Sequence, residues 1–451
     1  MPGGVWTSQN KVRPGAYINF EGEPLANISI GERGIAALTM PLSWGGEGEI
    51  INVLASDLIY GDALKKIGLK YEDAEALPVR LALSNCAMLK IFNSNANGEK
   101  AAVVIDVATE TGSGLRIDAK HPGTFGNKIA VLIDVANGIA TVETYADGFF
   151  VDRQKVPANS ISSLQNNDFV EFSGDGTLVT TESTRLTGGT DGATVTNLYT
   201  TFFNKLRNEI WNTVAITSTT GTDLTLAQNF IQDLRENEGK YVQAVVANSE
   251  DADYEGIINV VNGVNLSDGT QVTAAMFTTW VAGATAGAYI TESLTGKVVT
   301  GATSIISNLS NTEIIEALNA GKFVLSVNQD GSIRVEKDIN SYHSFDEHPT
   351  KGYEFSKNRI IRELDEIAAS IKNVWEKTYM GKISNNDTGR SLFKSSIISY
   401  MMSLQNVGAI QDFNTDSVQV EQGDNVDAVV AYLAVKPVDA MEFLYMTVTI
   451  S

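Results

Sequence analysis

The sequence predicts a multidomain α/β protein. It has an α/β core, an inserted all-β domain that is β-sandwich-like, a helical and β C-terminal domain, and extended arms at both ends. Three observations predict this class. Residues 99–190 hold short alternating segments between glycine turns, with no convincing helix. Residues 191–345 mix apolar strand-like runs with helical patterns. The remainder contains two long helical patterns and finishes on strand-like segments.

Length and composition agree with several folded domains. A chain of 451 residues, with 43% hydrophobic and 19% charged residues, can build more than one core. The expected parts are an N-terminal arm over 1–22, a first part of the core over 23–98, the inserted domain over 99–190, the α/β core over 191–345, a C-terminal domain over 346–435, and a C-terminal arm strand over 436–451.

Charge and cysteine content exclude several classes of protein. A net charge of −21 argues against wrapping nucleic acid, which needs a basic surface. The apolar runs are shorter than a membrane-spanning helix, and the N-terminus lacks the apolar stretch of a secretory signal, so we expect folding in a cytoplasm. The single cysteine, Cys86, excludes an internal disulfide framework and is expected to be a small buried hydrophobic residue.

In the first half of the chain, the positions of turn-forming residues predict where the strands and one helix lie. A short alternating piece covers 16–20, and a helix is expected near 56–66. Inside the inserted domain, turn signals of the NG, DG, GSG and GDG type recur about every ten residues, as in a β-sandwich or barrel. The strand candidates are AAVVIDV, LRIDAK, KIAVLIDV, IATVETY, FFVDRQKV, DFVEFSG and TLVTTES.

The α/β region begins with a recognisable unit. Residues 213–217 read as a buried strand, 223–238 as a helix stopped by Gly239, and 241–247 as a second strand, which together suit a parallel βαβ unit. Further on, Ser310 to Glu313 has the pattern of a capping box. Gly321 is expected to cap that helix before the strand KFVLSV.

Two helices and two strands are expected in the last region. Apolar residues at three- and four-residue spacing predict a helix over 352–380, ended by Gly381, and a second one from 387 to about Gly408. The charged run KNRIIRELDEI (357–367) in the first helix reads as a solvated face. The segments VVAYLAV and MEFLYMTVTI are expected to be strands, joined as a hairpin across KPVDA.

Two motifs could carry chemistry, and neither is convincing. LTGGTDG (186–192) lacks the lysine of a phosphate loop, and Asp191 would repel phosphate, so Gly188, Gly189 and Gly192 are interpreted as a flexible hinge to the inserted domain. HSFDEH (343–348) places two histidines at a spacing that fits no common metal site and is interpreted as a solvated loop. We therefore expect no catalytic residue, metal or cofactor.

Several stretches, taken in order over nearly the whole chain, carry a family resemblance. They are PGAYINF (14–20), GERGIAALTMPLSWG (31–45), AKHPGTFGNKIAVLID (119–134), LTGGTDG, KNRIIRELDEI, GKISNNDTGR (381–390) and KPVDAMEFLYMTV (436–448). Together they resemble the sheath proteins of contractile phage tails, most closely the PBSX-type sheaths of Gram-positive phages and phage-like bacteriocin particles. The loop 341–350 matches no pattern of that family.

The resemblance implies a structural and mechanical subunit rather than an enzyme. Such sheaths stack as six-subunit rings around a tail tube in a metastable extended helix, and they contract to drive the tube through the target cell envelope. The implied partners are other copies of the chain, the tail tube protein, and baseplate and tail-terminator proteins, with no direct contact to nucleic acid or membrane. The implied location is the tail of a virion or phage-like particle, assembled in the host cytoplasm; a phage and an R-type bacteriocin fit equally.

The resemblance also assigns roles to individual residues. Helices 352–380 and 387–407 would lie nearest the tube, and the inserted domain would face outward, where few contacts constrain it. Lys382, Arg390 and Lys394 are the candidate tube contacts. The candidate arm strands that join subunits are Tyr17, Ile18 and Phe20 at the N-terminus and Leu444, Tyr445, Met446 and Val448 at the C-terminus.

Two other classes stay open at this point. An α/β enzyme with a β-insertion would need a ligand site at the carboxyl ends of its parallel strands. A cell-surface or S-layer-like protein would fit the acidity and the β content, although the missing export signal counts against it.

Overall fold

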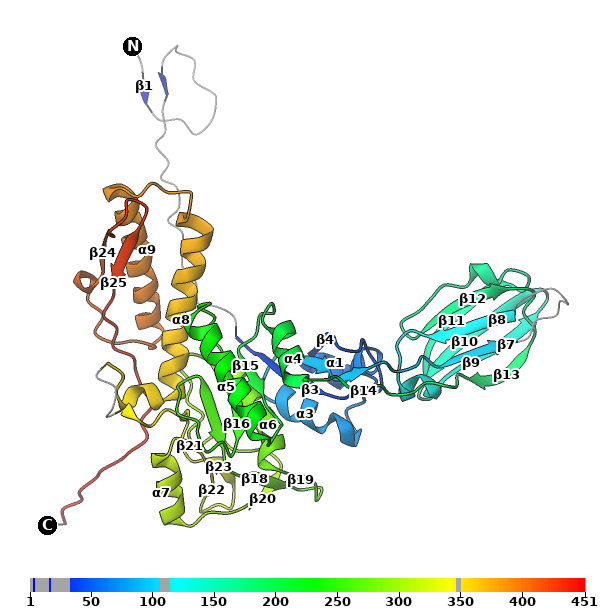
Figure 1. Ribbon diagram of the computed structural model, residues 1–451, viewed down its shortest axis with the longest axis horizontal. Helices are drawn as coiled ribbons and strands as arrows, with labels where there is room; N and C mark the ends of the chain where they lie inside the picture. Colours follow the sequence, from blue (N-terminus) through cyan, green and yellow to red (C-terminus); the bar gives the residue numbers. More distant parts are fainter. Residues whose placement is uncertain (1–2, 5–15, 18–32, 106–113, 346–349, 451) are drawn as a thin grey trace. The chain divides into compact units, whose positions relative to one another are not determined.

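The computed structural model describes residues 3–4, 16–17, 33–105, 114–345 and 350–450 (Figure 1). The chain forms two compact units. The core unit comprises Glu32–Asp365 together with Asp439–Ser451, and the helical unit comprises Met1–Gly31 together with Glu366–Val438. Each is described separately below. The mixed α/β, multidomain class expected from the sequence is confirmed.

A seven-stranded sheet forms the centre of the core unit. Its order is β21-β17-β16-β15-β3-β5-β4, and every pair is parallel except β4 with β5. The strands are β3 (Ile35–Met40), β4 (Ile50–Leu54), β5 (Met88–Asn93), β15 (Thr213–Ala215), β16 (Gln243–Ala247), β17 (Ile257–Val260) and β21 (Lys322–Phe323).

Helices cover both faces of this sheet, which explains why its strands read as continuous apolar runs. Along β3, Ala36 and Leu38 enter one hydrophobic cluster with α6, whereas Ala37 enters a second cluster with α4 and α5. The expected βαβ unit is confirmed, since β15 and β16 are parallel on either side of α5. The helices are α1 (Ala55–Tyr60), α2 (Ala63–Ile67), α3 (Leu77–Leu83), α4 (Leu198–Leu206), α5 (Gly221–Glu236), α6 (Ala274–Gly287) and α7 (Asn311–Asn319).

Two local expectations can be compared with these helices. The single helix expected over 56–66 is wrong, because Gly61 adopts a left-handed conformation (φ 90°) and divides the segment into α1 and α2. The capping box of α7 is confirmed: the Ser310 N–H donates to Glu313 Oε2 at 2.7 Å, and the Glu313 N–H donates to Ser310 Oγ. Cys86 is buried, as expected.

Smaller sheets complete the core around this centre. One has the order β19-β18-β20, and β22 pairs with β23. Another short pair, β6 with β14, joins the two chain crossings into the inserted domain. The bounds are β6 (Asn95–Ala96), β14 (Ala193–Thr194), β18 (Gly263–Leu266), β19 (Gln271–Val272), β20 (Ala302–Ile306), β22 (Leu325–Val327) and β23 (Ile333–Val335).

The inserted domain is a β-sandwich, drawn in cyan to blue-green in Figure 1. Its two antiparallel sheets have the orders β11-β10-β9-β13 and β12-β8-β7, and their inward side chains form one hydrophobic cluster. The strands are β7 (Ala102–Ile105), β8 (Gly114–Ala119), β9 (Ile129–Ala136), β10 (Ile139–Ala146), β11 (Phe149–Pro157), β12 (Val170–Asp175) and β13 (Thr181–Arg185). The last begins four residues later than its sequence pattern, TLVTTES, suggests.

Two tight hairpins follow directly from the turn sequences. Asn137-Gly138 joins β9 to β10, and Asp147-Gly148 joins β10 to β11. All four residues have positive φ, between 49° and 83°, which is the type I′ geometry that matches the twist of the flanking strands.

The sandwich is packed onto the rest of the core unit through Trp44. This fully buried side chain lies within the hydrophobic cluster of the sandwich, with its ring centroid 5.3 Å from Phe125 and 5.7 Å from Phe169. Its indole N–H donates to the Lys65 carbonyl at 3.0 Å. His121 meets the same indole edge-on at 5.1 Å, and burial is the main reason that the pKa of His121 is lowered. Trp44 thus ties the sandwich to the core within one subunit, and the outward position of the insertion in an assembly stays a prediction.

The helical unit is built on two helices and a hairpin. Helix α8 (Asn358–Val374) begins in the core unit and ends here in a π-helical turn over Trp375–Tyr379, and α9 covers Asp387–Asn406. The helix expected over 352–380 starts later, because Tyr353–Ser356 forms a separate 3-10 turn. Strands β24 (Gln419–Gln422) and β25 (Val429–Tyr432) pair antiparallel.

Candidate assembly site

The C-terminal segment is exposed and forms no strand within its own subunit. Residues 433–450 contain no strand, and 441–450 run as an extended trace to the C-terminus (Figure 1). The large apolar side chains of this segment are 68% to 103% exposed: Met441, Phe443, Leu444, Tyr445, Met446, Val448 and Ile450. The hairpin expected between VVAYLAV and MEFLYMTVTI is therefore wrong.

The predicted hairpin does not form because its first strand and the segment that follows it each pair with another part of the chain. β25 pairs with β24, and the segment before the tail pairs with the end of α9: the Val438 N–H donates to Ala409 O, and the Gln411 N–H donates to Lys436 O. The strand pattern of 441–450 is thus left with exposed apolar side chains and without a strand partner in the described part of the chain. Such a surface normally marks a site of association.

The hairpin β24–β25 offers edges of the kind that such a segment could join. Each of the two strands pairs only with the other among the described residues. Two β25 side chains, Val430 and Tyr432, are 37% and 59% exposed. Unpaired N–H and C=O groups along an edge strand are a template for a strand from another chain.

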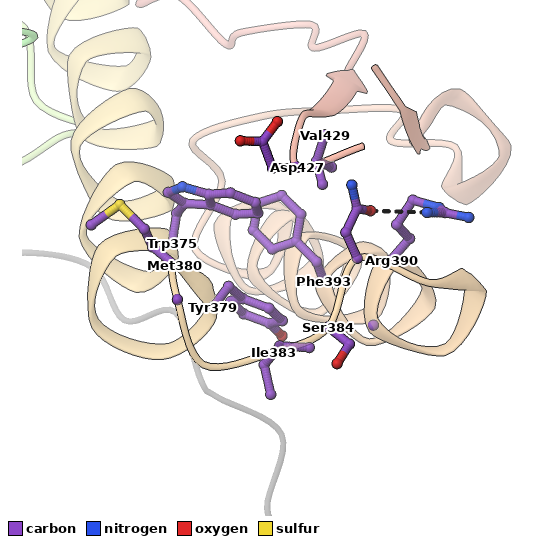
Figure 2. A pocket seen from close by; sticks show the side chains of 12 residues that line it. Trp375, Tyr379, Met380, Ile383, Ser384, Arg390, Phe393, Asp427 and Val429 are labelled. Carbon is purple, nitrogen blue, oxygen red and sulfur yellow. Dashed lines mark hydrogen bonds between the residues drawn. The ribbon is translucent and has the colours of Figure 1, made fainter. Parts of the chain in front are cut away.

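Beside this hairpin lies an aromatic pocket of about 270 Å³ (Figure 2). Trp375, Tyr379 and Phe393 form its floor, with the ring of Phe393 5.0 Å from Trp375 and 4.9 Å from Tyr379. Val429, the first residue of β25, lines its rim. The pocket is a concave surface beside β25, with an aromatic floor and polar side chains such as Asn385, Arg390 and Asp427 in its lining.

The three candidate tube contacts lie in the same unit, in different environments. Lys382 is exposed and donates to the Lys377 carbonyl. Arg390 is largely covered: its guanidinium donates to Asn385 Oδ1 at 2.9 Å and pairs with Asp387, and Asn385 in turn donates to the carbonyls of Val426 and Ala428. Lys394 is half-buried on α9. Arg390 thus supports the start of α9 and its link to the hairpin.

The N-terminal candidates are only partly described. Tyr17 lies in β2 (Ala16–Tyr17), which pairs in parallel with β1 (Gly3–Gly4). Ile18 and Phe20 lie outside the described residues.

The glycines of LTGGTDG allow close approach of two backbones. A Cβ at Gly189 would lie 2.5 Å from Gly123 O, and one at Gly192 would lie 2.2 Å from Ala96 O. Gly188 has φ 83° with open space around it. The return crossing is therefore packed against the outgoing one, and the hinge role of these glycines stays a prediction.

The histidine loop is described only in part. His343 Nδ1 lies 2.8 Å from Ser341 O and 3.3 Å from Asp253 Oδ1, while His348 falls outside the described residues. Across the described ranges, no three His, Cys, Asp or Glu side chains gather closely enough to hold a metal ion. No helix within those ranges has the length and apolar character to cross a membrane.

An enzyme with this parallel sheet would hold its ligand at the carboxyl ends of β15 and β16. An open cavity of about 710 Å³ lies there, beside the start of α5. Its only titratable lining residues are Glu250 and Asp251, both exposed. Among the described residues, no hydrogen bond joins either carboxylate to a hydroxyl of the cavity lining, as an activated nucleophile would require.

The charged run of α8 is buried, so its interpretation as a solvated face is wrong. Arg362 and Asp338 are 1% and 0% exposed and form an ion pair at 2.9 Å. The Arg235 guanidinium donates two 2.7 Å hydrogen bonds to the Asp365 carboxylate, and Asn358 donates to Asp338 at 2.9 Å. Local periodicity cannot reveal these partners, because they lie 20 to 130 residues away along the chain. The one sequence feature that could have indicated this burial is the high charge of KNRIIRELDEI at positions next to the apolar stripe of the helix.

The exposed apolar C-terminal segment indicates a protein that associates with other chains. Three family models match consecutive parts of the chain: the phage tail sheath β-sandwich domain at 96–191, the central domain at 193–341 and the C-terminal domain at 350–451. The chain belongs to the phage tail sheath protein family.

Individual relatives agree with this assignment. The phage-like element PBSX protein XkdK of Bacillus subtilis (strain 168) is 35% identical over the whole of both chains. A sheath tail protein from Desulfitobacterium hafniense has a sequence 38% identical to this one. Its crystal structure matches with a TM-score of 0.80, over 95% of this chain and 97% of that one. The contracted helical sheath of the anti-feeding prophage is 12% identical with a TM-score of 0.57, over 97% and 99%, and shares the fold.

Proposed function

We propose that this chain is the subunit of a contractile tail sheath, stacked as six-membered rings around a tail tube in a metastable extended state. Contraction then drives the tube through the envelope of a target cell. The observation that carries the proposal is the exposed, alternating apolar segment 441–450 in a member of the sheath family. An isolated subunit gains nothing from such a segment, whereas a polymer can bury it.

Strand addition is the proposed linkage between subunits. Leu444, Tyr445, Met446 and Val448 would extend the sheet of a neighbouring copy, with the open edges of β24–β25 as acceptor. Each main-chain hydrogen bond contributes a net ~1 kcal/mol, so a strand of several bonds is strongly held. The N-terminal arm, with Tyr17, Ile18 and Phe20, would make a second linkage.

Contraction requires that subunits move while staying linked. Rigid-body movement of a folded core preserves its packing, and the contracted state must lie lower in free energy behind a kinetic barrier. The buried ion pairs of α8 and the Trp44 junction support such a rigid core. No chemical fuel is then needed.

The remaining partners are proposed from the same role. The helical unit would face the tube, with Lys382, Arg390 and Lys394 as candidate contacts, and the β-sandwich would face outward. Baseplate and tail-terminator proteins would bound the polymer, which would assemble in the host cytoplasm and reside in the tail of a phage or R-type bacteriocin particle.

The test is removal of the arm. Deleting Phe443–Ser451 should leave a folded subunit that forms no sheath, because the described residues of this stretch are exposed and lie outside every helix and strand. Circular dichroism reports folding, and negative-stain electron microscopy reports striated tubes or stacked rings. A truncated chain that still forms sheath of normal length would contradict the role of the arm, and a full chain that stays monomeric under all conditions would contradict the sheath.

A further inference from the structure

The C-terminal arm begins with a buried carboxylate among exposed apolar residues. The side chain of Glu442 is 6% exposed, although its neighbours Met441 and Phe443 are 103% and 68% exposed. This inverts the ordinary pattern, in which apolar groups are covered and carboxylates face water. The segment is therefore held at Glu442, between two apolar side chains that face solvent.

Two side chains of the core unit hold this carboxylate. Lys357, itself 4% exposed, pairs with Glu442 Oε2, and Thr295 Oγ1 donates to Glu442 Oε1 at 2.7 Å. Lys357 also lies 3.2 Å from Asp439. Burial alone would lower the pKa of Lys357, but its hydrogen bond to Glu442 and the negative charges of Glu442 and Asp439 together raise that pKa.

The holding site continues into the buried network of α8. Thr295 Oγ1 accepts the Asp338 N–H at 2.9 Å, and Asp338 is the partner of Arg362. Beyond Glu442, the ring of Phe443 lies 5.5 Å from the ammonium of Lys337. From Leu444 onward the large side chains are exposed.

We propose that each subunit clamps the base of its own C-terminal arm through Lys357, Thr295 and Glu442, so that tension on residues 444–450 passes into its core at the start of α8. The clamp joins two of the sequence motifs noted above, KNRIIRELDEI and KPVDAMEFLYMTV. It makes the core, rather than the preceding segment 436–438, the part that bears load from a neighbour. This inference rests on the proposed function for the origin of the load, but the clamp itself is a property of the single subunit.

Proteolysis of the unassembled full-length subunit tests the clamp without any sheath. Chymotrypsin can cut after Phe443 and after Tyr445, and only the first site lies next to the clamp. A protease needs several flexible residues around the cut bond, so cleavage after Phe443 tracks opening of the clamp. Cleavage after Tyr445 serves as the internal reference, and mass spectrometry gives the ratio of the two.

Glu442→Gln should raise that ratio about tenfold or more, because a charge-assisted hydrogen bond to a buried lysine is lost. Lys357→Met should do the same, and Glu442→Gln remains informative if Lys357→Met fails to fold, since Glu442 lies outside the sheets and helices. The matched control is Asp412→Asn, whose pair with Lys436 is 2.7 Å long but exposed on both sides, and it should leave the ratio unchanged. An unchanged ratio in Glu442→Gln would overturn the clamp.

The load-bearing part is tested in the polymer. Sheaths of Glu442→Gln should form, because the strand residues 444–450 are unaltered, but they should break into rings at lower urea than wild type and Asp412→Asn. If they resist urea as well as wild type, load does not pass through the clamp. If no wild-type sheath forms, the proposed function fails while the proteolysis result still decides the clamp.

Discussion

At the scale of single residues, the buried charges of α8 determine where the helix sits in the core. Arg362 and Asp338 are almost fully buried, and each needs the other, because an isolated charge in an apolar interior loses its hydration without compensation. Arg235 with Asp365 repeats this arrangement one turn further along, and Asp365 holds the pKa of that arginine above its ordinary value despite burial. Both pairs fix the position of α8 against α5 and the loop after β23, which lie far away in sequence.

Removing one partner of such a pair should be costly. Asp338→Ala leaves Arg362 buried and uncompensated, so we expect a loss of about 3–5 kcal/mol in the free energy of unfolding of the unassembled subunit, measured by urea denaturation. Asp62→Ala is the control, because its pair with Lys65 is exposed on both sides and should contribute less than about 1 kcal/mol. Similar losses for the two variants would contradict the role assigned to the buried pair.

At the scale of elements, the β-sandwich is joined to the core by packing as well as by its two chain crossings. Trp44 comes from the loop after β3, yet it completes the hydrophobic cluster of the sandwich. His121 closes the same junction from the sandwich side, and its depressed pKa reflects loss of water, with the positive charges of Lys120 and Lys100 adding to the effect. The inserted domain is therefore packed against the core through buried side chains from both sides of the junction.

Trp44→Ala should open this junction. We expect a loss of about 3–5 kcal/mol in stability and a rise in the pKa of His121 toward its ordinary value, followed by NMR titration. Trp375→Ala removes one wall of the aromatic pocket instead and should leave the His121 titration unchanged, which makes it the matched control. A His121 pKa that is the same in Trp44→Ala and wild type would mean that the junction does not exclude water.

The same group makes the junction sensitive to pH. A lowered pKa means that the folded state binds fewer protons than the unfolded state, so the stabilisation is present above about pH 6.5 and decreases as the pH falls below it. His121→Gln should remove that part of the pH dependence, measured as urea midpoints between about pH 5 and pH 7.5. A profile as steep as wild type would assign the pH dependence to other groups.

Local chemistry predicted much of the fold, and distant partners account for what it missed. The Asn-Gly and Asp-Gly turns, the capping box at Ser310 and the βαβ unit each depend on a few neighbouring residues, and all are present. The burial of Lys357 and Arg362 depends on Glu442 and Asp338, which no local pattern indicates. The strand predicted at the C-terminus is absent for a different reason. Residues 441–450 have a high strand propensity, but a strand forms only where it can pair with the edge of another strand.

At the scale of the whole molecule, the net charge of −21 opposes polymerisation. Like charges on neighbouring subunits repel over about 10 Å at 0.1 M salt, and screening shortens that range. We therefore expect sheath assembly to become faster as the salt concentration is raised from about 0.02 M to about 0.3 M, and light scattering measures its rate. Faster assembly at low salt would instead indicate that complementary charged patches direct the contact. The Phe443–Ser451 deletion should scatter weakly at every salt concentration.

The order of the two units along the chain has a consequence for how such proteins diversify. The chain leaves the core unit after Asp365, forms the helices and hairpin of the helical unit, and returns to the core unit at Asp439. The ion pair between Lys357 and Glu442 joins the segments just before and just after this part of the chain. The intervening residues are thus a cassette between two fixed points. We infer that its surface can be exchanged while the core, the arm and their clamp stay the same. A chimera that carries Glu366–Val438 from a relative should fold, polymerise and keep its arm attached.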